Sequence, residues 1–139
     1  MTNRTLAHEY FTKGRIRRKA LAVLFAEGGH SDVVRESQEL VELVLKGLLR
    51  LFGIDPPKWH DVGLILDENR DLLPAVLVAQ LDRIIKLSAY LRAERELSFY
   101  GDEDILPSER YSAKDSVHCL AEVDWLLALL AEVLKNGGS

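Results

Sequence analysis

The stretch SDVVRESQELVELVLKGLLRLFG, residues 31–53, carries the clearest pattern in the chain. Ser31 is predicted to cap a helix with Asp32 behind it, and Gly53 followed by two prolines supplies the stop. The pattern predicts an amphipathic helix from about Asp32 to Phe52. Residues of its expected buried face recur at steps of one and three, namely Val33, Val34, Ser37, Leu40, Val41, Val44, Leu45, Leu48, Leu49 and Phe52.

Three other segments have the same helical period, and a shorter one resembles them. The long segments extend over Leu6–Ala26, Val76–Gly101 and Ser112–Lys135, and a short helix is expected over His60–Asn69 with Asp61 as its cap. The last long segment opens with the capping sequence Ser112-x-x-Asp115. In the first, the expected core-facing stripe consists of Ile16, Ala20, Val23 and Leu24. In the third, one face carries Val76, Leu77, Leu81, Ile84, Ile85, Ser88 and Leu91.

These segments predict an all-α fold, because the chain shows no strict alternation of apolar and polar residues bounded by turns. The simplest arrangement is an antiparallel bundle of four long helices plus a short one. A chain of 139 residues is the size of one domain, so we expect a single domain over residues 1–139. Its ordered part is expected at about 5–134, and residues 136–139 are predicted to form a flexible tail.

Composition and charge narrow the functions that the chain supports. Eighteen Lys and Arg against 22 Asp and Glu give a net charge of −4, so no broad surface for a polyanion is expected. One cysteine, Cys119, excludes an intrachain disulfide and a cysteine-cluster metal site, and the four histidines fall in four different predicted elements. The chain has no P-loop, G-x-S-x-G or H-E-x-x-H motif. We therefore predict neither a metal nor a cofactor, and the polar N-terminus favours a cytoplasmic location.

Two polar clusters have both a structural and a functional interpretation. The segment KGRIRRK, residues 13–19, holds five basic residues, which form either a solvated helix face with Ile16 in the core or a surface for phosphate groups. Gln38, Glu42 and Lys46 are spaced one helical turn apart. They form either a surface ion pair of about 0.3 to 0.5 kcal/mol or the polar wall of a groove.

The end of the third long helix, ERELSFYGDED at residues 94–104, combines an arginine with an aromatic pair. Gly101 alone suffices to end the helix, so the ending requires neither Arg95 nor Tyr100. Arg95 would also complement the negative pole of the helix dipole. Alternatively, its planar guanidinium holds a phosphate group while Tyr100 stacks on a base or donates its hydroxyl.

Taken together, three parts of the chain resemble the HEPN domain, the higher eukaryotes and prokaryotes nucleotide-binding family. These parts are the glycine turn before QELVELVLK, the GIDPPKWHDV connection and the R-x4-Y-G-D stretch, and the likeness extends over about residues 5–134. The resemblance implies a helical bundle that forms a homodimer. It also implies a minimal nucleotidyltransferase as partner, often encoded alongside in toxin–antitoxin modules.

HEPN proteins that cut RNA without a metal use an arginine followed, after four to six residues, by a histidine at the dimer interface. Arg95 matches that arginine, and Tyr100 stands at the first position where the histidine is expected. In a related motif, R-x4-H-x-Y, the position of the modified tyrosine corresponds to Asp102. Because tyrosine has a pKa near 10, it is a poor general base at neutral pH.

We therefore expect a nucleotide- or RNA-binding HEPN homodimer that acts with a nucleotidyltransferase, and we assign no catalytic residue. The expected ligand-binding residues are Arg95 and Tyr100, with Lys46, His60 and Asp102 as further candidates. One alternative is a metal-independent endoribonuclease in which His60 or His118 approaches Arg95. A second alternative is a protein-interaction module that binds no ligand and docks a partner helix on an apolar face.

Overall fold

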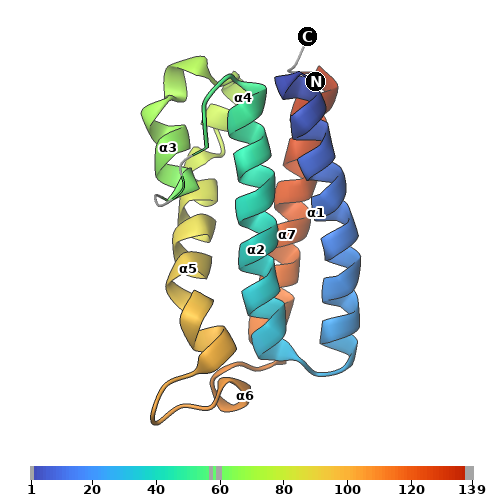
Figure 1. Ribbon diagram of the computed structural model, residues 1–139, viewed down its shortest axis with the longest axis vertical. Coiled ribbons are helices and arrows are strands. Elements are labelled where there is room, and N and C mark those ends of the chain that lie inside the picture. Colours follow the sequence, from blue (N-terminus) through green and yellow to red (C-terminus); the bar gives the residue numbers. More distant parts are fainter. Residues whose placement is uncertain (1, 57, 59–60, 137–139) are drawn as a thin grey trace.

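A computed structural model describes residues 2–56, 58 and 61–136 of the chain (Figure 1). His60 and residues 137–139 of the predicted tail lie outside the described residues. The long helices are α1 (Asn3–Ala26), α2 (His30–Leu51), α5 (Leu81–Tyr100) and α7 (Ala113–Asn136). The short ones are α3 (Val62–Glu68), the 3-10 helix η1 (Arg70–Leu72), α4 (Ala75–Val78) and α6 (Pro107–Arg110).

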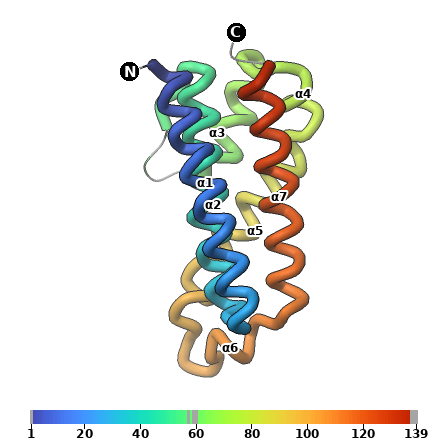
Figure 2. The backbone as a smooth tube through the Cα atoms, turned by 90° about the vertical axis from the view of Figure 1, so that its right-hand side faces the viewer, coloured from blue at the N-terminus to red at the C-terminus, as the bar shows by residue number. Residues whose placement is uncertain are grey.

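The predicted all-α bundle is confirmed, since the described part of the chain is built from helices and contains no strand. Helix α2 lies at the centre and contacts α1, α5 and α7, while α1 also packs beside α7 (Figures 1 and 2). Both ends of the chain lie at one end of the bundle, and α6 closes the other (Figure 2). Within the described ranges, no helix combines the length and apolar character needed to cross a membrane.

Helix α2 is central because its buried face is the widest of the bundle. Every apolar residue predicted to face inward between Val33 and Leu49 is buried, and the polar residues Ser37 and Gln38 are buried with them. Its start differs from the prediction, because Gly29, and not Ser31, is the N-cap. The reason is the tight turn from α1, in which Gly28 has a φ of 76° and the Gly29 amide donates to the Leu24 carbonyl at 2.8 Å.

The predicted core stripe of α1 is wrong except at Leu24, which is partly buried and packs against the core. Ile16 and Val23 are each 62% exposed and Ala20 is exposed, whereas the buried residues are Ala7, Gly14 and Leu21. These three residues are spaced seven apart, and two of them are small. Because alanine and glycine have little or no side chain, α1 can approach α2 closely. A Cβ atom on Gly14 would collide with Val44 Cγ1. Ile16, Ala20 and Val23 therefore face outward in the part of the chain that the structure describes.

The predicted caps of α3 and α7 are present, but the third predicted long helix is not continuous. Asp61 caps α3 by accepting a hydrogen bond from the Gly63 amide at 2.9 Å, and Asp115 accepts one from the Ser112 amide at 2.8 Å. The third predicted helix is divided, because the chain leaves α4 at Ala79 and Gln80 before α5 begins. Val76, which was placed on its inner face, is therefore 38% exposed.

Candidate functional site

Arg95 lies on the side of α5 that faces α2. Its Nη2 atom is 3.5 Å from Oε1 of Glu39, and half of its side chain is exposed. The same carboxylate oxygen accepts a hydrogen bond from Arg35 Nη1 at 2.6 Å. Two guanidinium groups therefore share one carboxylate, and the contact of Arg95 is the longer one. An anion can thus reach Arg95 without breaking the Arg35–Glu39 pair.

Two exposed aromatic rings continue this network toward the end of α5. The guanidinium carbon of Arg35 lies 4.9 Å from the centre of the Phe99 ring, and Phe99 meets Tyr100 edge to face at 4.6 Å. Phe99 is 48% exposed and Tyr100 is 76% exposed. Cation–π contact and the neighbouring ring hold the Phe99 ring, so the pair offers a surface on which a planar group can stack.

Lys46 lies on the same side of α2, one turn beyond Glu42. Its Nζ atom is 3.4 Å from Glu42, and the Gln38 amide donates to Glu42 at 2.9 Å. Burial opposes ionisation of Glu42, but the bond from Gln38 and the charges of Lys46 and Arg95 together hold its pKa below the usual value. The predicted ion pair is therefore present, and Glu42 and Lys46 form a polar wall, whereas Gln38 is buried.

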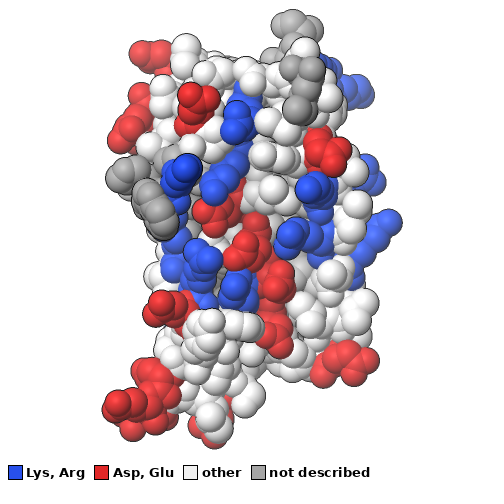
Figure 3. Space-filling view, in the orientation of Figure 1, with Lys and Arg blue, Asp and Glu red and all other residues white. Residues whose placement is uncertain are grey.

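The wall borders a hollow of about 160 Å³ between α1 and α2, which is lined by Arg17, Glu39, Glu42, Leu43 and Lys46. In Figure 3, Lys and Arg side chains interleave with Asp and Glu side chains over the middle of this face. The cations nearly balance the anions there, so the surface favours a small number of phosphate groups over a long polyanion.

The turn after α5 positions Asp102 differently from the other candidates. Gly101 has a φ of 70°, and the Asp102 carboxylate accepts a hydrogen bond from the Asp104 amide at 2.9 Å. Asp102 is exposed and lies within the acidic run Asp102–Asp104. Its observed contact is that of a turn residue, and its role as a ligand contact stays a prediction. His60, the fifth candidate, lies outside the described residues.

A second set of contacts fixes the end of α5 to the segment that follows α6. Tyr111 is buried, and its hydroxyl donates to Glu94 Oε2 at 2.5 Å. Burial raises the pKa of Tyr111, and its hydrogen bond to Glu94 raises it further. Arg110 Nη2 lies 3.3 Å from the other oxygen of Glu94. Glu94 is thus anchored while its neighbour Arg95 stays half exposed, which holds the arginine in place on a rigid helix end.

Two of the histidines and the single cysteine make contacts away from Arg95. His30 Nδ1 lies 2.7 Å from Ser116 Oγ, and the His118 ring packs edge to face on Tyr90. Neither of these contacts involves Arg35, Glu39 or Arg95. Cys119 is buried, and burial raises the pKa of its thiol to about 12, so it is no nucleophile at neutral pH. Among the described residues, no group of histidine, cysteine and carboxylate side chains is arranged to hold a metal ion.

The structure thus joins Arg95, Tyr100 and Lys46 in one surface and adds residues that sequence reasoning missed. The additions are Arg35, Glu39 and Phe99, and Arg17 of the predicted basic segment lies beside them. A signal for two of them exists in the sequence, since Arg35 and Glu39 are four residues apart on one helix face. No local pattern connects them with Arg95, which is 60 residues away from Arg35.

This combination defines an all-α bundle protein with an arginine and aromatic surface at the junction of α2 and α5. The chain matches the family model of the HEPN domain over residues 7–130, which is most of its length. The protein therefore belongs to the HEPN domain family. Comparisons with curated proteins and with solved structures found no match.

Proposed function

We propose that this HEPN protein binds nucleotides or RNA through the surface formed by Arg35, Lys46, Arg95, Phe99 and Tyr100. The observation that carries the proposal is the shared carboxylate of Glu39, which links a half-exposed arginine to an exposed aromatic pair. A guanidinium group donates two parallel hydrogen bonds to a phosphate, and exposed rings stack on bases. Both parts of a nucleotide thus have a matching group on this surface.

The energetics favour exchange of the carboxylate for a phosphate. An exposed ion pair such as Arg95–Glu39 contributes only about 0 to 1 kcal/mol, so releasing it costs little. Charge-assisted hydrogen bonds contribute about 1.5 to 3 kcal/mol each when they are well formed. Lys46 adds a further positive charge at the hollow beside Glu42. The site is therefore expected to bind weakly, with an affinity that falls as salt increases.

The proposal is tested by titrating fluorescein-labelled single-stranded RNA of about 12 nucleotides, and ATP, against the Arg95→Ala variant. We expect the dissociation constant to rise about tenfold, which corresponds to about 1.4 kcal/mol. Arg70→Ala is the matched control, because Arg70 is similarly exposed and paired with Asp67 at the far end of the bundle. Equal loss of affinity in both variants would contradict a specific site at Arg95.

Two further variants separate the groups within the site. Arg95→Lys keeps the charge but loses the planar fork, so partial retention of affinity would show that the charge dominates. Tyr100→Ala should reduce the affinity for RNA more than the affinity for inorganic phosphate, since stacking requires a base. Gel analysis of the same RNA tests the endoribonuclease alternative, for which no described histidine contacts the Arg95 network. Intact RNA after incubation is the expected result.

We further propose that the protein acts as a homodimer with a minimal nucleotidyltransferase as partner, in a toxin–antitoxin-like pair. Membership of the HEPN family and the Arg95-x4-Tyr100 sequence support this proposal. Light scattering after size exclusion should give twice the 15.7-kDa mass of the chain. A single species at the monomer mass over a hundredfold range of concentration would contradict the dimer. A transferase that does not change the elution position would contradict the partnership.

A further inference from the structure

A second surface, where α1 lies beside α7, has cations without an ion-pair partner among the described residues. Of the five basic residues between 13 and 19, Arg17 pairs with Glu36 at 3.8 Å and Arg18 pairs with Asp124 at 2.6 Å. Lys13, Arg15 and Lys19 have no ion-pair partner among the residues that the structure describes. The sequence left this segment as either a solvated face with Ile16 in the core or a surface for phosphate groups, and its environment suggests a third role.

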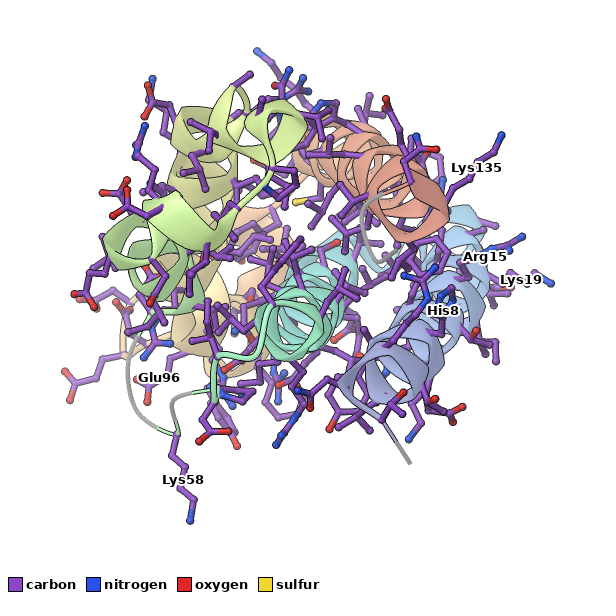
Figure 4. The ribbon with its side chains drawn as sticks, turned by 90° about the horizontal axis from the view of Figure 1, so that it is seen from above. His8, Arg15, Lys19, Lys58, Glu96 and Lys135 are labelled. Carbon is purple, nitrogen blue, oxygen red and sulfur yellow. The ribbon has the colours of Figure 1, made fainter. Side chains whose placement is uncertain are left out.

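The two cations Arg15 and Lys19 stand at the edge of an apolar groove between α1 and α7. The groove has a volume of about 340 Å³, and its lining consists of Phe11, Arg15, Arg18, Lys19, Leu127, Ala128 and Ala131. Figure 4 shows Arg15, Lys19 and Lys135 on the same side of the molecule, reaching outward from α1 and α7. An apolar floor is thus bordered by cations of α1, and Lys135 of α7 lies on the same side of the molecule.

The floor indicates what kind of molecule fits the groove. Ala128 and Ala131 are exposed, and their short side chains leave room for the side chains of another element. A phosphate backbone would use the cations but would gain nothing from an aliphatic floor, and Phe11, the one ring of the groove lining, is only partly exposed. An amphipathic helix uses both features, since its apolar ridge fills the floor and its flanking side chains meet the rim.

Charge complementarity then fixes the character of that helix. Arg15 and Lys19 favour carboxylates beside the apolar ridge, since none of the described residues that line the groove is acidic and the nearby Asp124 is already paired with Arg18. From His8 to Lys19 the face of α1 extends about 17 Å, at 1.5 Å per residue, which matches about three turns of a docked helix. Ala20 and Val23 of the exposed stripe line a separate hollow with Arg17, Leu24 and Glu36, so the apolar floor of the groove is the part between α1 and α7 alone.

We propose that the groove between α1 and α7 binds an acidic amphipathic helix of a partner protein. The inference does not depend on the nucleotide site, because the residues that carry it lie on α1 and α7 and include neither Arg95 nor Tyr100. Opposite charges along the rim orient the incoming helix, and the apolar ridge supplies most of the buried area.

The test uses a synthetic fluorescein-labelled helix of about 18 residues, or five turns, with leucine on one face and glutamate on both flanks. We expect this peptide to bind the full chain and its lysine-flanked counterpart to fail. Arg15→Glu with Lys19→Glu should raise the dissociation constant at least tenfold. Lys86→Glu with Lys114→Glu is the matched control. It changes the net charge by the same amount, at an exposed lysine on α5 and an exposed lysine in the first turn of α7.

A second variant, Ala131→Trp, tests the groove itself. Ala131 is exposed, so the larger ring should leave the fold intact and block the floor, and circular dichroism checks the fold. Loss of peptide binding in this variant supports the proposal. Failure of the acidic peptide to bind at about 1 mM, or equal losses in the control pair, would overturn it. The proposal would also be overturned if labelled RNA or anionic vesicles bind the wild type and the Ala131→Trp variant equally but do not bind the variant with Arg15→Glu and Lys19→Glu.

Discussion

The Gly101→Ala variant is expected to unfold about 10 °C below the wild type, a loss of about 3 kcal/mol. Gly101 ends α5 with φ 70° and ψ −152°, a region of backbone space that is essentially restricted to glycine. A Cβ atom there would also collide with the carbonyl oxygen of Ile105 and lie 2.9 Å from Pro107 Cδ. Backbone and proline ring cannot rotate away as a long side chain can, so the turn after Tyr100 has to move.

Gly28→Ala is the control for this effect. Gly28 has a similar φ of 76°, but a Cβ atom at this position has no neighbour within 4 Å. This variant carries the cost of the left-handed backbone alone, about 1 to 2 kcal/mol. Thermal and urea unfolding of both variants measure the difference. Equal losses would mean that the contacts with Ile105 and Pro107 contribute nothing, and would contradict the close packing of the turn against α5.

The second large effect is expected at the contact between α1 and α2. In an exposed helix, replacing glycine by alanine stabilises by about 0.5 to 1 kcal/mol. At Gly14 the sign should reverse, because the added methyl group would collide with Val44 Cγ1 and lie 3.5 Å from Leu127 Cδ2. Overpacking in a filled core costs about 1 to 3 kcal/mol, so Gly14→Ala should destabilise by about 2 kcal/mol in urea unfolding.

A double-mutant cycle identifies the cause. Val44→Ala removes the Cγ1 atom and leaves a Cβ atom 4.0 Å from the position of the new methyl group, which is ordinary contact. Val44→Ala alone should destabilise by creating a cavity, and Gly14→Ala should then fill part of it. The double variant is therefore expected to be more stable than the sum of the two single losses predicts. Strict additivity would exclude direct contact between the two positions.

Most helix ends could be predicted from the sequence because capping is a local interaction. The Ser112–Asp115 capping pair and the Asp61 cap join residues two or three positions apart, and Gly101 ends α5 through its own backbone angles. The N-cap of α2 was missed, since a turn that begins in α1 selects Gly29 over Ser31. Arg95 and Tyr100 were predicted as ligand-binding residues from the 94–104 stretch and from the family resemblance, neither of which required knowledge of the packing, and their role stays a prediction.

The orientation of α1 and the composition of the site could not be predicted in the same way. Periodicity shows that a helix has an apolar stripe, and it assigned Ile16 and Val23 to the core. Packing chose the other face, because Ala7 and Gly14 let α1 approach α2 at Gly47, where a Cβ atom would lie 2.9 Å from Tyr10 Cβ. The joining of Arg95 to Arg35 and Phe99 through Glu39 likewise depends on how α5 packs on α2.

The sequence by itself therefore determined the all-α class, the four long helices and the family of the protein. All three depend on the period of apolar residues and on local motifs. Only the tertiary structure decided which face of α1 stays outside and which side chains surround Arg95. The physical reason is that helix packing depends on the shapes of two surfaces at once, and no single segment contains that information.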